Sequence, residues 1–126
     1  MLFRSCPADT LNFDSLAAST LIADGDTVDG ITFSSPGLAS FGVTMQVRND
    51  FDTTSAPNFL GTDDRGVFQD GDDFELSFGP VSAIGMYFIT ADLMFDDDIF
   101  LSAGGATASL LASAVQQTLP DGGSVF

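Results

Sequence analysis

Apolar residues alternate with polar ones along most of this chain, and turn-forming residues interrupt the alternation. In residues 74–78, three apolar side chains alternate with a glutamate and a serine. Because successive side chains of a β-strand point to opposite faces, a period of two predicts half-buried strands. The same pattern occurs in residues 30–34 and 41–48. Short strands bounded by Gly, Asp, Ser or Pro predict an all-β sandwich or barrel.

The second half of the chain adds further strand predictions. Residues 82–91 are nearly continuous in apolar side chains, which predicts a central strand covered on both faces. Residues 97–103 and 107–115 flank a Gly-Gly pair and predict a hairpin, although the second run also fits a helix. One short helical turn is expected in residues 14–20, which begin with a capping aspartate.

The C-terminal residues predict a turn followed by the start of one more strand at Val125 and Phe126. A sandwich that stops there would expose an unpaired strand edge, which proteins normally cover, twist or charge. We therefore expect a domain that is incomplete at its C-terminal edge. Either the chain is a fragment, or this edge pairs with another chain.

Length and apolar content predict one folded domain. The 126 residues are 44% hydrophobic and include thirteen phenylalanines, enough large apolar groups to form a core. We assign the domain to residues 11–126. Residues 1–10 lack an apolar segment long enough for a secretory signal, so we expect a disordered or wrongly assigned N-terminal segment.

The charge of the chain excludes several classes of function. Eighteen acidic residues against three arginines give a net charge of −15, with no lysine and no histidine. Such a surface repels phosphate backbones and anionic lipids, so we expect no nucleic-acid partner. No run reaches the roughly twenty apolar residues of a membrane span, so no membrane insertion is expected. Without histidine, Ser-His-Asp and Cys-His catalysis are unavailable, and Cys6 stands alone.

Aspartates concentrate in two loop segments, residues 49–52 and 63–73. Calcium takes six to eight oxygen ligands, which a loop with several carboxylates and carbonyls can supply. Turns also use Asp and Gly for their own geometry, so the same residues fit solvated turns. Residues 24–30 do not match an EF-hand loop. The predicted calcium ligands are Asn49, Asp50, Asp52, Asp63, Asp64, Asp70, Asp72 and Asp73.

Aromatic residues near these loops are candidates for ligand binding. Most phenylalanines lie at alternating positions typical of a core, whereas Phe51, Phe59 and Phe68 lie outside that pattern. With Asn58 they form the predicted ligand-binding set. The chain has no tryptophan and one tyrosine, which weakens the hypothesis of a glycoside-acting enzyme built on paired carboxylates.

Three segments carry a further pattern: a Gly-Ile-Thr-Phe strand at residues 30–33, an Asn-x-Leu-Gly segment at 58–61 and a Pro-Val-Ser-Ala-x-Gly step at 80–85. Over residues 11–91, this order resembles the exported β-sandwich domains of bacterial proteins that often carry a PEP-CTERM sorting tail. The resemblance implies an antiparallel jelly-roll-like sandwich, similar to carbohydrate-binding modules and exported or on the cell surface. It also implies that Asp14 occupies the position of a structural calcium ligand.

Two classes of function follow. The first is a non-enzymatic, calcium-stabilised module that binds carbohydrate or extracellular matrix. The second is a structural surface or assembly protein that pairs with itself through an open strand edge near Val125 and Phe126. A glycoside-acting enzyme domain is a minor alternative.

Overall fold

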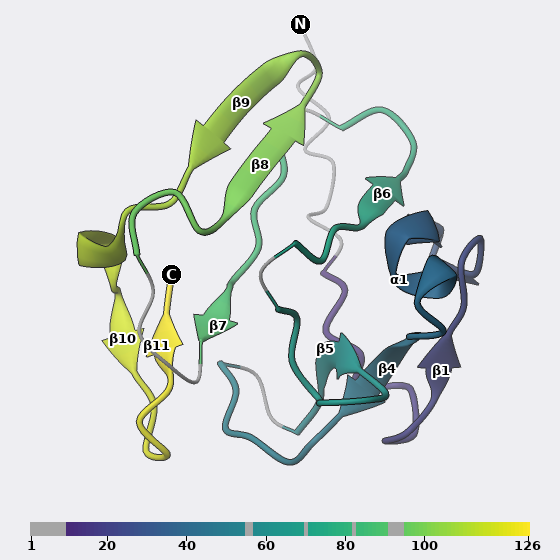
Figure 1. The fold of residues 1–126 in the computed structure, drawn as a ribbon, viewed down its shortest axis with the longest axis horizontal. Coiled ribbons are helices and arrows are strands. Elements are labelled where there is room, and N and C mark those ends of the chain that lie inside the picture. The colour runs from purple at the N-terminus through teal and green to yellow at the C-terminus, as the bar shows by residue number, and fades with distance from the viewer. Residues whose placement is uncertain (1–9, 55–56, 70, 82, 91–94) are drawn as a thin grey trace, which may run out of the picture.

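The computed structural model describes residues 10–54, 57–69, 71–81, 83–90 and 95–126 (Figure 1). These residues form short antiparallel strands with almost no helix, which confirms the all-β prediction. The strands belong to four small sheets that are not joined into closed layers. Cys6, Asp70 and Ser82 lie outside the described residues.

Two three-stranded sheets make up the first part of the chain. One has the order β1–β4–β5, with β1 at Leu21–Ile22, β4 at Met45–Arg48 and β5 at Phe59–Thr62. The other has the order β2–β3–β6, with β2 at Thr27–Val28, β3 at Ile31–Ser34 and β6 at Glu75–Ser77. The short helix α1, Pro36–Ser40, joins β3 to the loop before β4.

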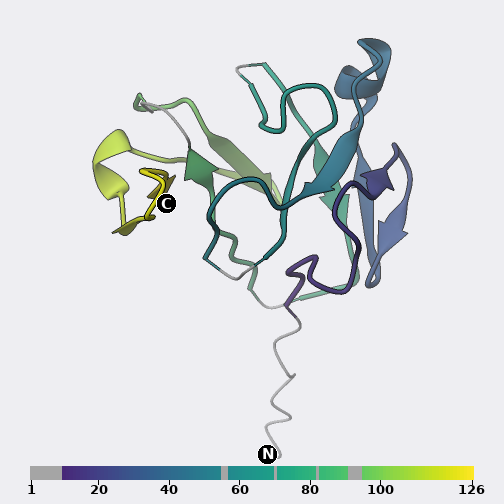
Figure 2. The same ribbon diagram turned by 90° about the horizontal axis from the view of Figure 1, so that it is seen from below.

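Two further sheets make up the second part. One has the order β10–β11–β7, with β7 at Ile89–Thr90, β10 at Gln117–Thr118 and β11 at Ser124–Val125. The other is a hairpin of β8 (Phe100–Ala103) and β9 (Ala106–Ser109), followed by the 3₁₀ turn η1 at Ala112–Ala114. Figures 1 and 2 both place β10 and β11 on the side of the molecule opposite β1 and α1.

The main core lies between the two N-terminal sheets and α1. Strand β4 alternates as predicted, so that Met45 and Val47 are buried while its other two residues are partly exposed. Ile22, Phe33 and Leu38 complete the buried cluster. The Phe33 ring contacts Phe13, with ring centroids 6.1 Å apart. Burial of these apolar side chains is the principal stabilising contribution in this half of the chain.

Several predicted strands are confirmed. Residues 30–34 and 74–78 contain β3 and β6, which pair with each other. The Gly104–Gly105 pair forms the turn of the β8–β9 hairpin, and both glycines have positive φ. The strand predicted for residues 41–48 begins only at Met45, because α1 ends at Ser40 and Gly42 turns the chain at a φ of +74°.

Other predicted elements are wrong in their extent. The predicted central strand at residues 82–91 is reduced to β7 among the described residues, because residues 83–87 pair with no neighbouring strand and are exposed. The predicted helical turn near Asp14 is a hydrogen-bonded turn in which Leu16 N donates to Phe13 O. Residues 107–115 are a strand only as far as Ser109.

The predicted open edge at the C-terminus is also wrong. Strand β11 lies in the middle of its sheet, paired with β10 on one side and β7 on the other. The turn at Gly122, with a φ of +95°, connects β10 to β11. It reverses the chain so that β11 lies between β10 and β7. Phe126 and Phe88 then donate backbone hydrogen bonds to each other, and Val125 and Phe126 are buried. Among the described residues, no helix is long and apolar enough to cross a membrane.

Candidate functional site

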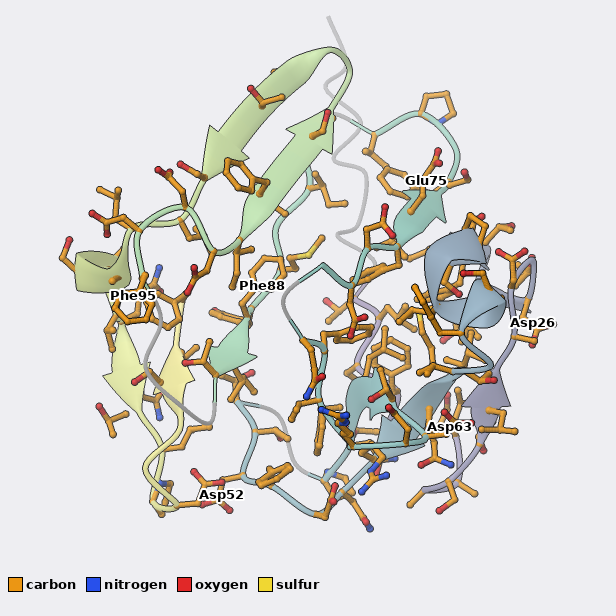
Figure 3. All side chains as sticks on the ribbon, in the orientation of Figure 1. Asp26, Asp52, Asp63, Glu75, Phe88 and Phe95 are labelled. Atoms are coloured by element: carbon orange, nitrogen blue, oxygen red, sulfur yellow. The ribbon has the colours of Figure 1, made fainter. Side chains whose placement is uncertain are left out.

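A cavity of about 170 Å³ lies between the loop before β5 and the C-terminal sheet. Its lining residues come from β5 and the loops on either side of it, and from strand β7 and the β10–β11 turn, which are distant in sequence. Figure 3 shows Asp52 beside that turn. The lining residues are Phe51, Asp52, Phe59, Val67, Ile89, Asp121 and Gly123.

Two aspartates tie the two walls of the cavity together. Asp52 N donates a hydrogen bond of 2.8 Å to Asp121 Oδ2, and Asp121 N donates one of 3.0 Å to Asp52 Oδ2. Asp121 Oδ1 also accepts from Gly123 N at 2.9 Å. The Gly123 and Asp52 N–H groups lower the pKa of Asp121, because they stabilise its charged form. The Asp121 carboxylate is therefore ionised at neutral pH.

Two phenylalanines form the apolar part of the wall. The Phe51 and Phe59 ring centroids are 6.0 Å apart, with the planes tilted by 52°. Phe59 begins β5 and is held by its pairing with Arg48 in β4. Phe51 keeps 41% of its surface exposed. Two of the four predicted ligand-binding residues thus line one cavity.

The other two predicted ligand-binding residues have structural contacts. Asn58 is 6% exposed, and its Nδ2 donates to Phe13 O and Leu16 O at 3.0 and 2.9 Å. Its backbone N–H donates to Asp14 Oδ1 at 3.3 Å. Asn58 therefore fastens the turn at the start of the domain to β5. The ring of Phe68 packs on Phe74 at 5.0 Å, against the main core.

The predicted calcium ligands are distributed over separate local contacts. Asp63 and Thr44 exchange hydrogen bonds, in which Asp63 Oδ1 accepts from Thr44 N at 2.9 Å. Asp72 Oδ2 accepts from Gln69 N at 2.7 Å within its own turn. Figure 3 shows Asp52 and Asp63 well apart on the fold.

The remaining predicted ligands have individual environments. Asp50 forms an ion pair with Arg48, and this hydrogen bond lowers the pKa of Asp50. Asp64 Oδ2 lies 3.8 Å from the Nε of the next residue, Arg65. Asn49 and Asp73 are not buried. Among the described residues, which exclude Asp70, no group of three or more Asp, Glu, Cys or His is arranged to hold a metal ion.

A second, more polar hollow of about 310 Å³ lies beside α1. Its carboxylate belongs to Asp24, whose Oδ1 accepts hydrogen bonds from Ser35 N at 2.7 Å and Ser34 Oγ at 3.0 Å. These bonds fix the loop after β1 to the start of the helix. Asp24 therefore has a structural contact at this position.

Sequence reasoning missed the half of the cavity that comes from the C-terminal sheet. The Pro-Asp-Gly-Gly segment at residues 120–123 indicates a turn, but nothing in it indicates that Asp121 meets a residue 69 positions away. No protein-family model matches the chain, and no curated protein or solved structure shows significant similarity to it.

Proposed function

We propose that this protein is an exported, non-enzymatic β-sandwich module of the jelly-roll type that binds carbohydrate in the Phe51–Asp121 cavity. The observation that supports the proposal is the meeting of two phenylalanines and two aspartates from distant segments around one small space. Ligand sites in proteins typically combine an apolar wall with a few polar groups that orient the ligand. Carboxylates accept hydrogen bonds from sugar hydroxyls, and the rings offer a surface for the apolar face of a sugar.

The electrostatics of Asp121 do not fit the proton donor of a glycoside-acting enzyme. A glycoside-acting enzyme needs one carboxylic acid that stays protonated near neutral pH, which requires a raised pKa. The pKa of Asp121 is instead lowered by backbone N–H groups. In addition, Oδ2 of each aspartate accepts a hydrogen bond from the backbone N–H of the other, and these two bonds hold the walls of the cavity together.

Glycan binding is tested by titrating the purified protein with a panel of tetrasaccharides in a calorimeter. We expect saturable binding at one site and, for Phe51→Ala, about a tenfold loss of affinity, equivalent to ~1.4 kcal/mol. Phe41→Ala is the matched control, because Phe41 is an exposed phenylalanine that does not line the cavity. Absence of binding by the folded wild-type protein to every glycan would contradict the proposal.

Assembly through an apolar surface is the second candidate function. Val81, Ile84, Met86 and Tyr87 are exposed before β7, and Tyr87 keeps 66% of its surface accessible. These residues, rather than the paired C-terminal strand, are where a second molecule would bind under this hypothesis. Sedimentation at increasing protein concentration separates the candidates, because a glycan-binding module can remain monomeric whereas an assembly protein must associate.

Calcium stabilisation of the acidic loops belongs to the proposal and has its own test. Thermal melts are recorded in chelator, in a calcium series and in a matched magnesium series. Binding to the native state alone predicts a calcium-specific rise in Tm, equivalent to about 2.7 kcal/mol at a hundredfold excess over Kd. Equal small shifts with both ions would instead reflect screening of the net charge of −15, and would remove calcium from the proposal.

A further inference from the structure

We propose that the cavity selects glycans that carry a protonated primary amine, such as glucosamine oligomers, over neutral glycans of the same size. This inference rests on the proposed carbohydrate-binding function and specifies the class of ligand. Three features of the cavity support it: the supply of hydrogen-bond donors and acceptors, the balance of charge and the character of the apolar wall.

The cavity offers acceptors but few donors. None of the seven lining side chains carries an N–H or O–H group, because they are phenylalanine, ionised aspartate, valine, isoleucine and glycine. The backbone N–H groups of Asp52, Asp121 and Gly123 already donate to carboxylates. A sugar hydroxyl both donates and accepts, so a neutral sugar would leave its acceptors unmatched here. An ammonium group has three donors and no acceptor, which matches this supply.

One carboxylate oxygen is available for such a donor. Asp52 Oδ2 accepts from Asp121 N, whereas Asp52 Oδ1 accepts no hydrogen bond from the described residues. This oxygen belongs to a side chain that lines the cavity. An ammonium group bound to it would form a charge-assisted hydrogen bond, which is stronger than a bond to a neutral hydroxyl.

Among the described residues, no cationic side chain lines the cavity to balance the charge of the two aspartates. Arg48 pairs with Asp50, Arg65 contacts Asp64 and Gln69, and neither arginine lines the cavity. Backbone hydrogen bonds keep Asp121 ionised. Because the whole chain carries −15, its field also attracts cations and repels anionic glycans.

The aromatic wall favours the same class of ligand. The face of a phenylalanine ring carries partial negative charge and attracts an ammonium group placed over it. Phe51 and Phe59 line the same cavity as Asp52, so the cavity offers a cation both aromatic rings and a carboxylate.

The test compares the affinity of the full chain for glucosamine tetramer, N-acetylglucosamine tetramer and cellotetraose by calorimetry. The titrations are made at about pH 6, where a primary amine is protonated and aspartates are ionised. We expect the glucosamine tetramer to bind at one site at least tenfold more tightly than the other two. Acetylation keeps the sugar chain and removes the charge, so this pair isolates the contribution of the ammonium group.

Two variants locate the effect. Asp52→Asn should reduce the preference to less than threefold, because the amide keeps the shape but loses the charge and the acceptor-only character. Asp97→Asn is the matched control: it removes one negative charge from an exposed residue outside the cavity and should leave the preference unchanged. A thermal melt of each variant confirms that it is folded.

The outcomes separate this inference from the proposed function. Equal affinity for all three tetramers would overturn amine selection and leave carbohydrate binding intact. No binding to any of them would overturn both. A preference for glucosamine that Asp97→Asn reduces as much as Asp52→Asn does would show general attraction to an acidic surface, and would also overturn the selective site.

Discussion

Replacement of Phe33 by alanine should lower the free energy of unfolding by about 3–5 kcal/mol, the usual cost of truncating a buried phenylalanine. Phe33 is 1% exposed and lies in β3, the middle strand of its sheet. Its ring contacts Phe13 and belongs to the cluster formed with Ile22, Met45 and Val47. Alanine removes these contacts and leaves a cavity that the paired strands on both sides cannot close.

The matched control is Phe41→Ala, because Phe41 is 84% exposed and should change stability by no more than about 0.5 kcal/mol. Urea denaturation followed by far-ultraviolet circular dichroism gives both values on one scale. Similar effects of the two substitutions would contradict the assignment of the core to the space between β3 and β4. The comparison holds residue type constant, so burial alone separates the variants.

The part of the fold predicted correctly is the part in which one face of a strand is buried. In β4, the alternating pattern alone predicts that Met45 and Val47 are buried, because the side chains of a half-buried strand point in turn to the core and to solvent. Residues 82–91 show no such alternation. Their continuous apolar run fits a strand covered on both faces, yet the described residues up to Tyr87 are exposed. An apolar composition favours burial, but whether a segment is buried depends on which other elements pack against it.

Pairing between distant strands is where sequence reasoning reached its limit. The turn before β11 was predictable from its Pro-Asp-Gly-Gly residues, but the insertion of β11 between β10 and β7 depends on contacts with residues far along the chain. The same limit applies to the cavity. Phe51 and Phe59 were predicted as ligand-binding residues and Asp52 as a calcium ligand, whereas Asp121 was not predicted, because only the folded chain brings it to Asp52.

The acidic loops show a related limit. Aspartate is common both in turns and among calcium ligands, so an Asp-rich composition fits either role. The position of each carboxylate in the folded chain distinguishes the two. The Asp63 carboxylate accepts a hydrogen bond from Thr44 N, just before β4, and the Asp72 carboxylate accepts one from Gln69 N within its own turn. Spacing along the chain does not specify these local partners, so it predicted a shared site where the described side chains have separate contacts.

Replacement of Gly61 by alanine should destabilise the protein by about 3 kcal/mol, at the upper end of the cost of overpacking. A Cβ atom at this position would overlap the carbonyl oxygen of Gly66 and lie 2.9 Å from its carbonyl carbon. Both obstacles are backbone atoms, so no side chain can rotate out of the way. Glycine inside a strand often marks such a close backbone approach, and here Gly61 is a buried residue of β5.

The loop that Gly61 supports leads directly to the cavity. Gly66 N donates to Thr62 O at 3.0 Å, and the next residue, Val67, lines the cavity. Relief of the clash requires this loop to move away from β5, so Gly61→Ala should also weaken glycan binding.

The control for this substitution is Gly79→Ala. A methyl group added at Gly79 would meet no atom within 4 Å, and Gly79 has no positive φ. The control variant should therefore stay within about 0.5 kcal/mol of the wild type. Equal stability of the two variants in urea would mean that β5 and the following loop do not approach each other as closely as the structure places them.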